Sequence, residues 1–367
     1  MENNHLTYFK IENFKKFDSL EVNDIGQFNL IVGDNNVGKT CLLEALLFDE
    51  DLAQLISNFY LALTKRGLKF EIEEITRKSG NLITTETLYP KENYFEKFIF
   101  GKFSSQVTFD YKVNDKKEKF VLKINDKERL RNSLKGYQSE KNIQFEDYIK
   151  QFLFFEINDI GNSTTNWIYG YNENKMDFPL ISFNDTPLDE ITRSIYENLK
   201  TKREKQILID VLKVVNSKIV DIELRENFED LKSVFLISFE DKDEFVPLNF
   251  LGDGFKRIFY IVLKALSLKG KRILIDEIEI GIHYSKMKDF WINIMKVCKE
   301  LDVQLFATTH SQECTETYIE ASNLLNYNND IRLIKLEEST NKEKIYASTF
   351  TYKQISAGIE SNVELRG

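Results

Sequence analysis

Short apolar runs and amphipathic stretches alternate along this chain, and the alternation predicts a layered α/β fold. Residues 28–32, 273–275 and 303–307 are mostly apolar, which is typical of strands in a sheet that is covered on both faces. Residues 41–48 and 249–264 predict helices, the second of them entered through a tight glycine-containing turn. We therefore expect strand ends and helix starts to meet along one edge of a sheet, where open α/β sheets bind ligands.

The middle of the chain shows other patterns. Between about residues 100 and 125, apolar and polar side chains alternate with a period of two, which predicts an antiparallel hairpin. Residues 126–216 are predicted to be mainly helical, with a heptad-like apolar spacing around 188–216 that covers too few turns for a long coiled-coil arm. The predicted domains are a discontinuous head, 1–125 and 217–367, and a mainly helical lobe or short arm at 126–216.

Composition narrows the class of protein. The chain has 367 residues, 42% of them hydrophobic and 30% charged, which is enough for one large α/β domain with an insertion or for two domains. The net charge of −9 disfavours a diffuse basic surface for coating DNA, although a local basic groove for nucleic acid stays open. An odd count of 3 cysteines, no secretory leader and no long apolar span predict a cytoplasmic protein without a membrane partner.

The octapeptide GDNNVGKT at residues 33–40 lies between a predicted strand and a predicted helix. This is the context that the G-x-x-x-x-G-K-[ST] phosphate-binding loop requires. Glycines let backbone amides turn inward around an anion, and the helix start adds its positive end. The lysine supplies a point charge for the β and γ phosphates, and the threonine hydroxyl can bind Mg²⁺. The predicted nucleotide-binding residues are Gly33, Asn35, Asn36, Gly38, Lys39 and Thr40.

Two later strands end in polar residues that suit the same site. Asp276 follows the apolar run 273–275 and can hold Mg²⁺, together with Thr40. Glu277 comes directly after it and is predicted to be the general base that activates the attacking water. His310 follows the next strand and can contact the γ-phosphate or that water. Taken alone, an Asp-Glu pair is a common surface pattern and a histidine is often structural.

A second cationic segment precedes the acidic strand. Gly254 forms part of a tight turn, and Lys256 and Arg257 stand in the first turn of the helix that follows. Basic residues at a helix N-terminus oppose the macrodipole, so a nearby anion would relieve the conflict. Because the loop at 33–40 already supplies a cradle for its own nucleotide, we expect this surface to face the nucleotide of another copy, in a homodimer or higher oligomer.

These segments, in this order, resemble the ABC-type ATPases of the SMC, RecF and OLD (overcoming lysogenization defect) group of AAA-family proteins. The resemblance rests on FKIENFKKFDSLEV with the phosphate loop, on DEIEIGIH at 276–283 and on TTHS at 308–311. It is strong over about residues 5–50 and 245–315. The group's Leu-Ser-x-Gly signature is replaced by LGDG at 251–254, so one γ-phosphate contact of the group is missing.

The resemblance implies a P-loop ABC-type head with a mixed sheet, an antiparallel β subregion and an inserted lobe. It also implies ATP and Mg²⁺ as cofactors and an ATP-dependent head-to-head dimer. In that dimer Gly254 of one copy would cap the nucleotide that Lys39 and Asp276 of the other copy hold. By position, Gln151 is a candidate for the group's Mg²⁺-contacting glutamine.

The resemblance further predicts a working role. We expect an ATPase, converting ATP and water to ADP and phosphate, that gates a partner effector or a DNA transaction. OLD-type nucleases carry a TOPRIM domain after the switch histidine, but its Glu-Gly and Asp-x-Asp elements do not occur after His310. A separately encoded nuclease or toxin is therefore the expected partner, as in antiphage defence systems built on similar ATPases. The alternative is an ATP-dependent assembly scaffold or sensor with slow hydrolysis, which Gly252 in place of the signature serine favours.

Overall fold

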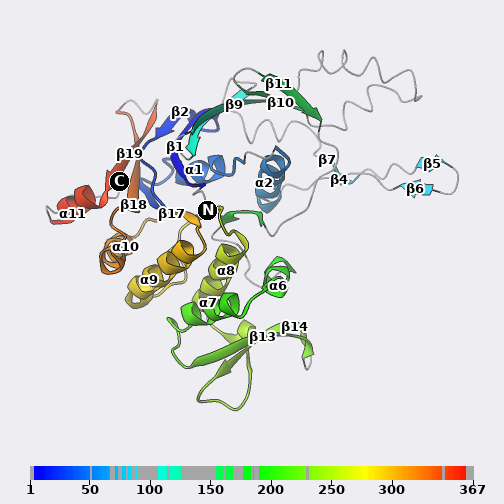
Figure 1. The fold of residues 1–367 in the computed structure, drawn as a ribbon, viewed down its shortest axis with the longest axis vertical. Helices are drawn as coiled ribbons and strands as arrows, with labels where there is room; N and C mark the ends of the chain where they lie inside the picture. The colour runs from blue at the N-terminus through cyan, green and yellow to red at the C-terminus, as the bar shows by residue number, and fades with distance from the viewer. Residues whose placement is uncertain are drawn as a thin grey trace.

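The structure of this protein is a computed structural model (Figure 1). The described residues are 4–49, 52–66, 71–72, 77–79, 82–84, 88–89, 106–113, 116–124, 154–159, 162–167, 177–182, 185, 190–228, 231–340 and 344–360.

A six-stranded central sheet carries the apolar runs. Its order is β12-β16-β17-β3-β18-β19, and all neighbours are parallel except β18 and β19. Every residue of β3 and β17 is buried, as predicted for strands covered on both faces. The strands are β3 (Phe28–Gly33), β12 (Leu180–Ile181), β16 (Arg272–Ile275), β17 (Gln304–Thr308), β18 (Ile331–Glu338) and β19 (Ile345–Thr351).

An antiparallel sheet forms the second layer, in the order β11-β10-β9-β8-β1-β2. The hairpin predicted from the alternating pattern near residues 100–125 is confirmed, because β8 and β9 pair in antiparallel register. Strand β8 of this hairpin pairs in antiparallel register with β1, which lies next to the edge strand β2. The strands are β1 (Leu6–Phe14), β2 (Phe17–Val22), β8 (Gln106–Val113), β9 (Lys116–Ile124), β10 (Phe154–Asp159) and β11 (Asn162–Trp167).

Helices cover both faces of the central sheet. Figure 1 shows α1 and α2 between the central and antiparallel sheets, and α7, α8 and α9 on the other side. The helices are α1 (Lys39–Ala45), α2 (Leu52–Lys65), α6 (Glu190–Glu197), α7 (Lys202–Leu212), α8 (Asp253–Ser267), α9 (Tyr284–Glu300), α10 (Gln312–Leu325) and α11 (Tyr352–Glu360).

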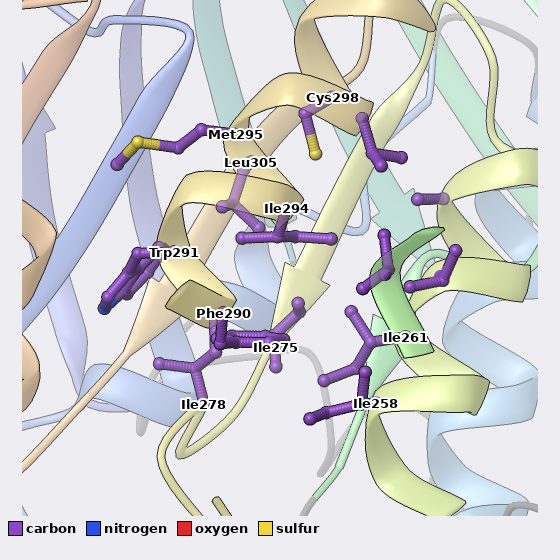
Figure 2. Close-up of a cluster of buried hydrophobic side chains, with 14 of the residues drawn as sticks. Ile258, Ile261, Ile275, Ile278, Phe290, Trp291, Ile294, Met295, Cys298 and Leu305 are labelled. Atoms are coloured by element: carbon purple, nitrogen blue, oxygen red, sulfur yellow. The ribbon is translucent and has the colours of Figure 1, made fainter. Parts of the chain in front are cut away.

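The central sheet separates two hydrophobic cores. Ile273 and Ile275 of β16 belong to the core shared with α7, α8 and α9, whereas Leu274 belongs to the core shared with α1 and the antiparallel sheet. Alternate residues of a strand point to opposite faces, which explains why an unbroken apolar run is needed here. Figure 2 shows the first core, where Ile258 and Ile261 of α8 lie opposite Ile294 of α9.

A small antiparallel sheet, β13-β14-β15, lies at the far end of the molecule beyond α7 (Figure 1). A 3-10 turn, Leu248–Phe250, leads from it into α8. Its strands are β13 (Ile219–Phe228), β14 (Leu231–Phe239) and β15 (Val246–Pro247); two short pairs, β4 (Glu71–Ile72) with β7 (Leu88–Tyr89) and β5 (Arg77–Ser79) with β6 (Leu82–Thr84), complete the described strands.

The prediction of a mainly helical lobe at 126–216 is wrong for part of that segment. Residues 190–212 do contain α6 and α7, but β10 and β11 extend the antiparallel sheet and β12 pairs with β16 in the central sheet. β12 has only two residues, too few for a periodic signal, and tertiary pairing decides its structure. The heptad-like apolar positions belong to α7, whose buried side chains, such as Leu208 and Leu212, pack in the core rather than on an arm.

None of the helices in the described ranges combines the length and the apolar character that crossing a bilayer would require.

Candidate functional site

The loop at residues 33–40 has the predicted strand–loop–helix geometry. It leaves β3 at Gly33 and enters α1 after Gly38, and both glycines have positive φ, 143° and 115°. A Cβ on Gly33 would lie 2.4 Å from the carbonyl oxygen of Leu336, so only glycine fits at that turn. Gly38 is the N-cap of α1, and the loop therefore ends at the positive end of a helix.

Lys39 lies inside this loop. The residue is only 6% exposed, and its Nζ donates to the carbonyl oxygens of Gly33 at 2.5 Å and Asp34 at 2.9 Å. The same Nζ is 3.4 Å from Nδ1 of His310. Burial lowers the pKa of Lys39, while the carboxylates of Asp276 and Asp34 act in the opposite direction. The structure thus brings Lys39 and His310, which are far apart in sequence, to one point.

Asp276 stands at the carboxyl end of β16, as predicted, and is 7% exposed. The Thr40 hydroxyl donates to its carboxylate at 3.2 and 3.3 Å, and the Thr308 hydroxyl donates to Oδ1 at 2.7 Å. A hydroxyl and a carboxylate are the oxygen ligands that Mg²⁺ takes beside substrate phosphates, whereas a closed protein cage is not expected for this ion. Thr40 and Asp276 therefore fit the predicted Mg²⁺ role.

Glu277 has an unusual backbone. Its φ is 50°, in the left-handed region that non-glycine residues seldom adopt and that often marks functional sites. Its N–H donates to Thr308 Oγ1 at 2.8 Å, and its carbonyl oxygen accepts from Arg257 at 3.2 Å. Within the described residues, its carboxylate has no hydrogen-bond or ion-pair partner, which leaves it able to accept a proton from water.

A third carboxylate, Glu279, links this turn to the histidine loop. Its Oε1 accepts from the backbone N–H of His310 at 2.9 Å, while its Oε2 is buried without a hydrogen-bond partner. The sequence shows Glu279 only as part of the DEIE pattern, and no function could be assigned to it from the pattern. His283, in the same segment, accepts from the N–H of Ser285 and caps α9, which is a structural role.

The cationic helix start differs from the sequence prediction in one respect. Arg257 is 6% exposed, and its guanidinium donates to carbonyl oxygens of its own chain. The prediction that Arg257 reaches the nucleotide of another copy is therefore wrong, because this face of α8 packs toward the strand ends. Lys256 pairs with Asp253 at 2.5 Å. Neither Gly254 nor Lys256 forms a hydrogen bond or ion pair with residues 33–40 in the described part of the chain, and their role toward a second copy stays a prediction.

Gly254 is required within its own chain. A Cβ there would lie 1.8 Å from the carbonyl oxygen of Gly281, whereas a Cβ on Gly252 would meet nothing within 4 Å. Gly254→Ala is expected to lower the free energy of unfolding by about 2 kcal/mol, through forced backbone displacement. Gly252→Ser is the matched control, because serine is a good N-cap and should be neutral or slightly stabilising.

Urea-induced unfolding followed by circular dichroism measures the free energy of unfolding of both glycine variants. A Gly254→Ala protein as stable as the wild type would contradict the close approach of the two backbone segments. Because of this expected clash, a bulky residue at position 254 would lower the stability of the chain in addition to disturbing any interface with a second copy.

The site residues belong to a chain with recognisable relatives. The family described as "AAA domain, putative AbiEii toxin, Type IV TA system" matches residues 28–314. A protein of Helicobacter pylori (strain ATCC 700392 / 26695) named "ATP/GTP phosphatase" is 25% identical over 338 residues, which are 84% of this chain and 85% of that protein.

Solved structures of SMC heads share the fold. The SMC head bound to the C-winged helix domain of ScpA has a TM-score of 0.55 at 10% identity, over 95% of this chain and 99% of that chain. The SMC head with an extended coiled coil, bound to the C-terminal domain of ScpA derived from Pyrococcus furiosus, has a TM-score of 0.51 at 10% identity, over 98% and 99%. These likenesses confirm the predicted P-loop ABC-type fold with its mixed sheets.

The family match extends from the strand before the phosphate loop to the residues just after the switch histidine, which is more than half of the chain. It therefore includes all the elements that converge on Lys39 and Asp276. The prediction of an AAA-family ATPase with the fold of SMC heads is confirmed, and the chain belongs to the family described as "AAA domain, putative AbiEii toxin, Type IV TA system".

Proposed function

We propose that this chain binds ATP with Mg²⁺ at residues 33–40 and hydrolyses it to ADP and phosphate. The observation that carries the proposal is the convergence of three distant segments: Thr40 Oγ1 lies 3.2 Å from Asp276, and Lys39 Nζ lies 3.4 Å from His310. A phosphate cradle, candidate oxygen ligands for a hard cation and a histidine at one sheet edge support this proposal. The "ATP/GTP phosphatase" relative supports nucleotide hydrolysis.

Each residue of the site has a distinct role in the proposed reaction. The amides of the loop and the buried ammonium of Lys39 hold the β and γ phosphates. Thr40 and Asp276 would hold Mg²⁺, which neutralises phosphate charge when bound. Glu277 accepts the proton of the attacking water, and the Thr308 hydroxyl fixes both acids by bonding the Asp276 carboxylate and the Glu277 N–H. His310 is positioned to contact the terminal phosphate.

ATP is favoured over GTP, although one feature of the sequence points the other way. Residues 174–177 spell Asn-Lys-Met-Asp and match the N/T-K-x-D pattern that reads guanine in GTPases. Asp177 pairs with Lys271, at the amino end of β16, 3.1 Å away. That end of the strand is opposite to the one that carries Asp276, so Asp177 lies away from the phosphate loop. Gln151 lies outside the described residues, and its predicted Mg²⁺ contact stays a prediction.

Phosphate release from ATP and from GTP, each with Mg²⁺ and with excess EDTA, tests the proposed activity. We expect Mg²⁺-dependent turnover that is faster with ATP. A purified, folded chain that binds neither nucleotide in calorimetric titration would contradict the proposal. Equal turnover of both nucleotides would contradict only the preference for ATP.

We further propose that two copies enclose the nucleotides head to head. Phe250 and Tyr284 are 75% and 71% exposed, the two most exposed large hydrophobic side chains among the described residues. Phe250 shortly precedes Gly254 and Tyr284 shortly follows Gly281 in the sequence, so both stand on segments that come together where these glycines meet. Exposed aromatic side chains beside a close backbone contact suit a protein–protein interface.

Phe250→Asp should weaken ATP-dependent dimerisation at least about tenfold, because it places a charge in the apolar contact. The matched control is Leu324→Asp, which changes another exposed hydrophobic residue (59%) near the end of α10. Light scattering with ATP, in a Glu277→Gln background that slows hydrolysis, provides the readout. A Glu277→Gln protein without the second substitution that stays monomeric under all nucleotide conditions would overturn the proposed dimer.

For the biological role we propose a general setting. The family description names a toxin of a type IV toxin–antitoxin system, which supports a defence or growth-control setting in which ATP turnover gates a separately encoded nuclease, toxin or DNA transaction. The second candidate is a nucleotide-dependent scaffold with slow hydrolysis. It is favoured by Gly252, which replaces the signature serine and whose missing side chain would have open space around it. Turnover far slower than nucleotide-dependent dimerisation would select the scaffold.

A further inference from the structure

One buried arginine ties the start of α8 to the ends of two strands. Arg257 Nη1 donates to the carbonyl oxygen of Ser182, just after β12, at 3.1 Å. Its Nη2 donates to the carbonyl oxygens of Asp276 at 2.8 Å and Glu277 at 3.2 Å, just after β16. A guanidinium presents several donors in a fixed plane, so it can hold these carbonyls in one arrangement, which an ammonium cannot do.

Two of the three carbonyls that Arg257 binds belong to the turn that carries Asp276 and Glu277. Glu277 has a φ of 50°, which L residues adopt rarely, and its backbone is held on one side by Thr308 and on the other by Arg257. A rare backbone conformation persists only where neighbours fix it. The direction of the Glu277 carboxylate therefore depends on the position of Arg257.

The same helix start contacts the far end of this turn. Gly254 packs so closely against Gly281 that no Cβ would fit between them. The start of α8 thus contacts both ends of the segment 276–281. Arg257 binds the beginning of that segment, and Gly254 packs against its end. Both contacts therefore connect the helix start to the segment that contains Glu277.

Burial alone does not explain an arginine at this position. Its Nε is buried without a hydrogen-bond partner, so the side chain is not fully satisfied by its surroundings. Burial lowers the pKa of Arg257, and the carboxylates of Asp185, Asp276, Glu277 and Glu279 favour its charged form. An apolar residue of similar length would avoid these penalties if packing were the only requirement.

We propose that Arg257 is a positioning residue that transmits the placement of the α8 start to Glu277, so that the general base is aligned only when this helix start is correctly seated. The inference rests on the proposed ATPase function and deepens it. It assigns to Arg257 a role within its own chain, distinct from any contact of Gly254 or Lys256 with a second copy.

Arg257→Met and Arg257→Lys test this role, with Arg272→Met as the matched control. Arg272 lies at the opposite end of β16. Its guanidinium donates to the carbonyl oxygen of Phe48 at 2.7 Å and lies over the aromatic ring of Phe48. Each variant is measured for kcat, KM, ATP affinity and thermal unfolding. The split between kcat and binding separates positioning from a general loss of structure.

We expect Arg257→Met to lower kcat about 100-fold while ATP affinity stays within about threefold, because a displaced base loses alignment with the water. Arg257→Lys should recover part of kcat, since an ammonium can still donate to one or two of the carbonyls. Arg272→Met should lose stability but keep kcat within about threefold of wild type.

The outcomes distinguish a failure of the proposed ATPase function from a failure of the role of Arg257. Wild-type protein without turnover of ATP or GTP would contradict the proposed function itself. An active wild type, together with an Arg257→Met kcat equal to that of Arg272→Met, would overturn the role of Arg257 alone. Should Arg257→Met fail to fold, Arg257→Lys decides: a folded protein with reduced kcat and unchanged ATP affinity supports the role, and an unchanged kcat overturns it.

Discussion

Glu277→Gln should leave ATP binding intact and slow hydrolysis by about 10²- to 10⁴-fold, the usual contribution of a general base. Glutamine has nearly the same shape as glutamate, so the water site is preserved. The amide cannot accept the proton that the water must lose. The backbone bonds that hold this residue come from Thr308 and Arg257 and do not involve its side chain. The substitution therefore removes the proton acceptor without removing the turn.

Glu279→Gln is the control for this experiment. It makes the same chemical change two residues away, and its amide oxygen can still accept from the His310 N–H that Glu279 Oε1 binds at 2.9 Å. We expect its turnover to stay within about tenfold of wild type. Single-turnover phosphate release and calorimetric ATP binding are the measurements. Turnover of Glu277→Gln equal to wild type would remove Glu277 from the chemistry.

Much of the site could be predicted from sequence because its chemistry is local. The phosphate loop needs glycines at two turns, a lysine and a hydroxyl within eight positions, and φ values of 143° and 115° at Gly33 and Gly38 show why glycine is required there. Asp276 could be placed because it ends an apolar run, and parallel strands bring their carboxyl ends to one edge. The placement of His310 beside Lys39 follows from the same rule.

Other features depend on tertiary packing and leave no local signal. Sequence spacing shows that Arg257 stands one turn into α8, but it does not show that this side chain points toward the ends of β12 and β16. Nothing in the sequence marks Glu277 as left-handed, since no glycine or asparagine occupies the position. β12 joins the central sheet with two residues, and its pairing with β16 is visible only in the fold.

Lys39→Ala should weaken ATP binding by at least about 100-fold, which corresponds to about 2.8 kcal/mol. The Lys39 ammonium is buried inside the loop, where it donates to the carbonyl oxygens of Gly33 and Asp34. A buried charge with so little water around it interacts strongly with phosphate oxygens. Burial lowers the pKa of Lys39, so the charged form is disfavoured by folding. Removal of this charge should consequently leave the unliganded protein folded.

Lys16→Ala is the matched control, because Lys16 also donates to a loop carbonyl, that of Asn36, but is exposed to solvent. Exposed charges are screened, and its loss should weaken ATP binding by less than about tenfold. The depressed pKa adds a pH test: ATP affinity of wild type should fall as the pH rises through the lowered pKa of Lys39, because only the ammonium attracts phosphate. Lys39→Ala should show no such fall. An ATP affinity of Lys39→Ala close to wild type, in a folded protein, would mean that the nucleotide does not occupy this loop.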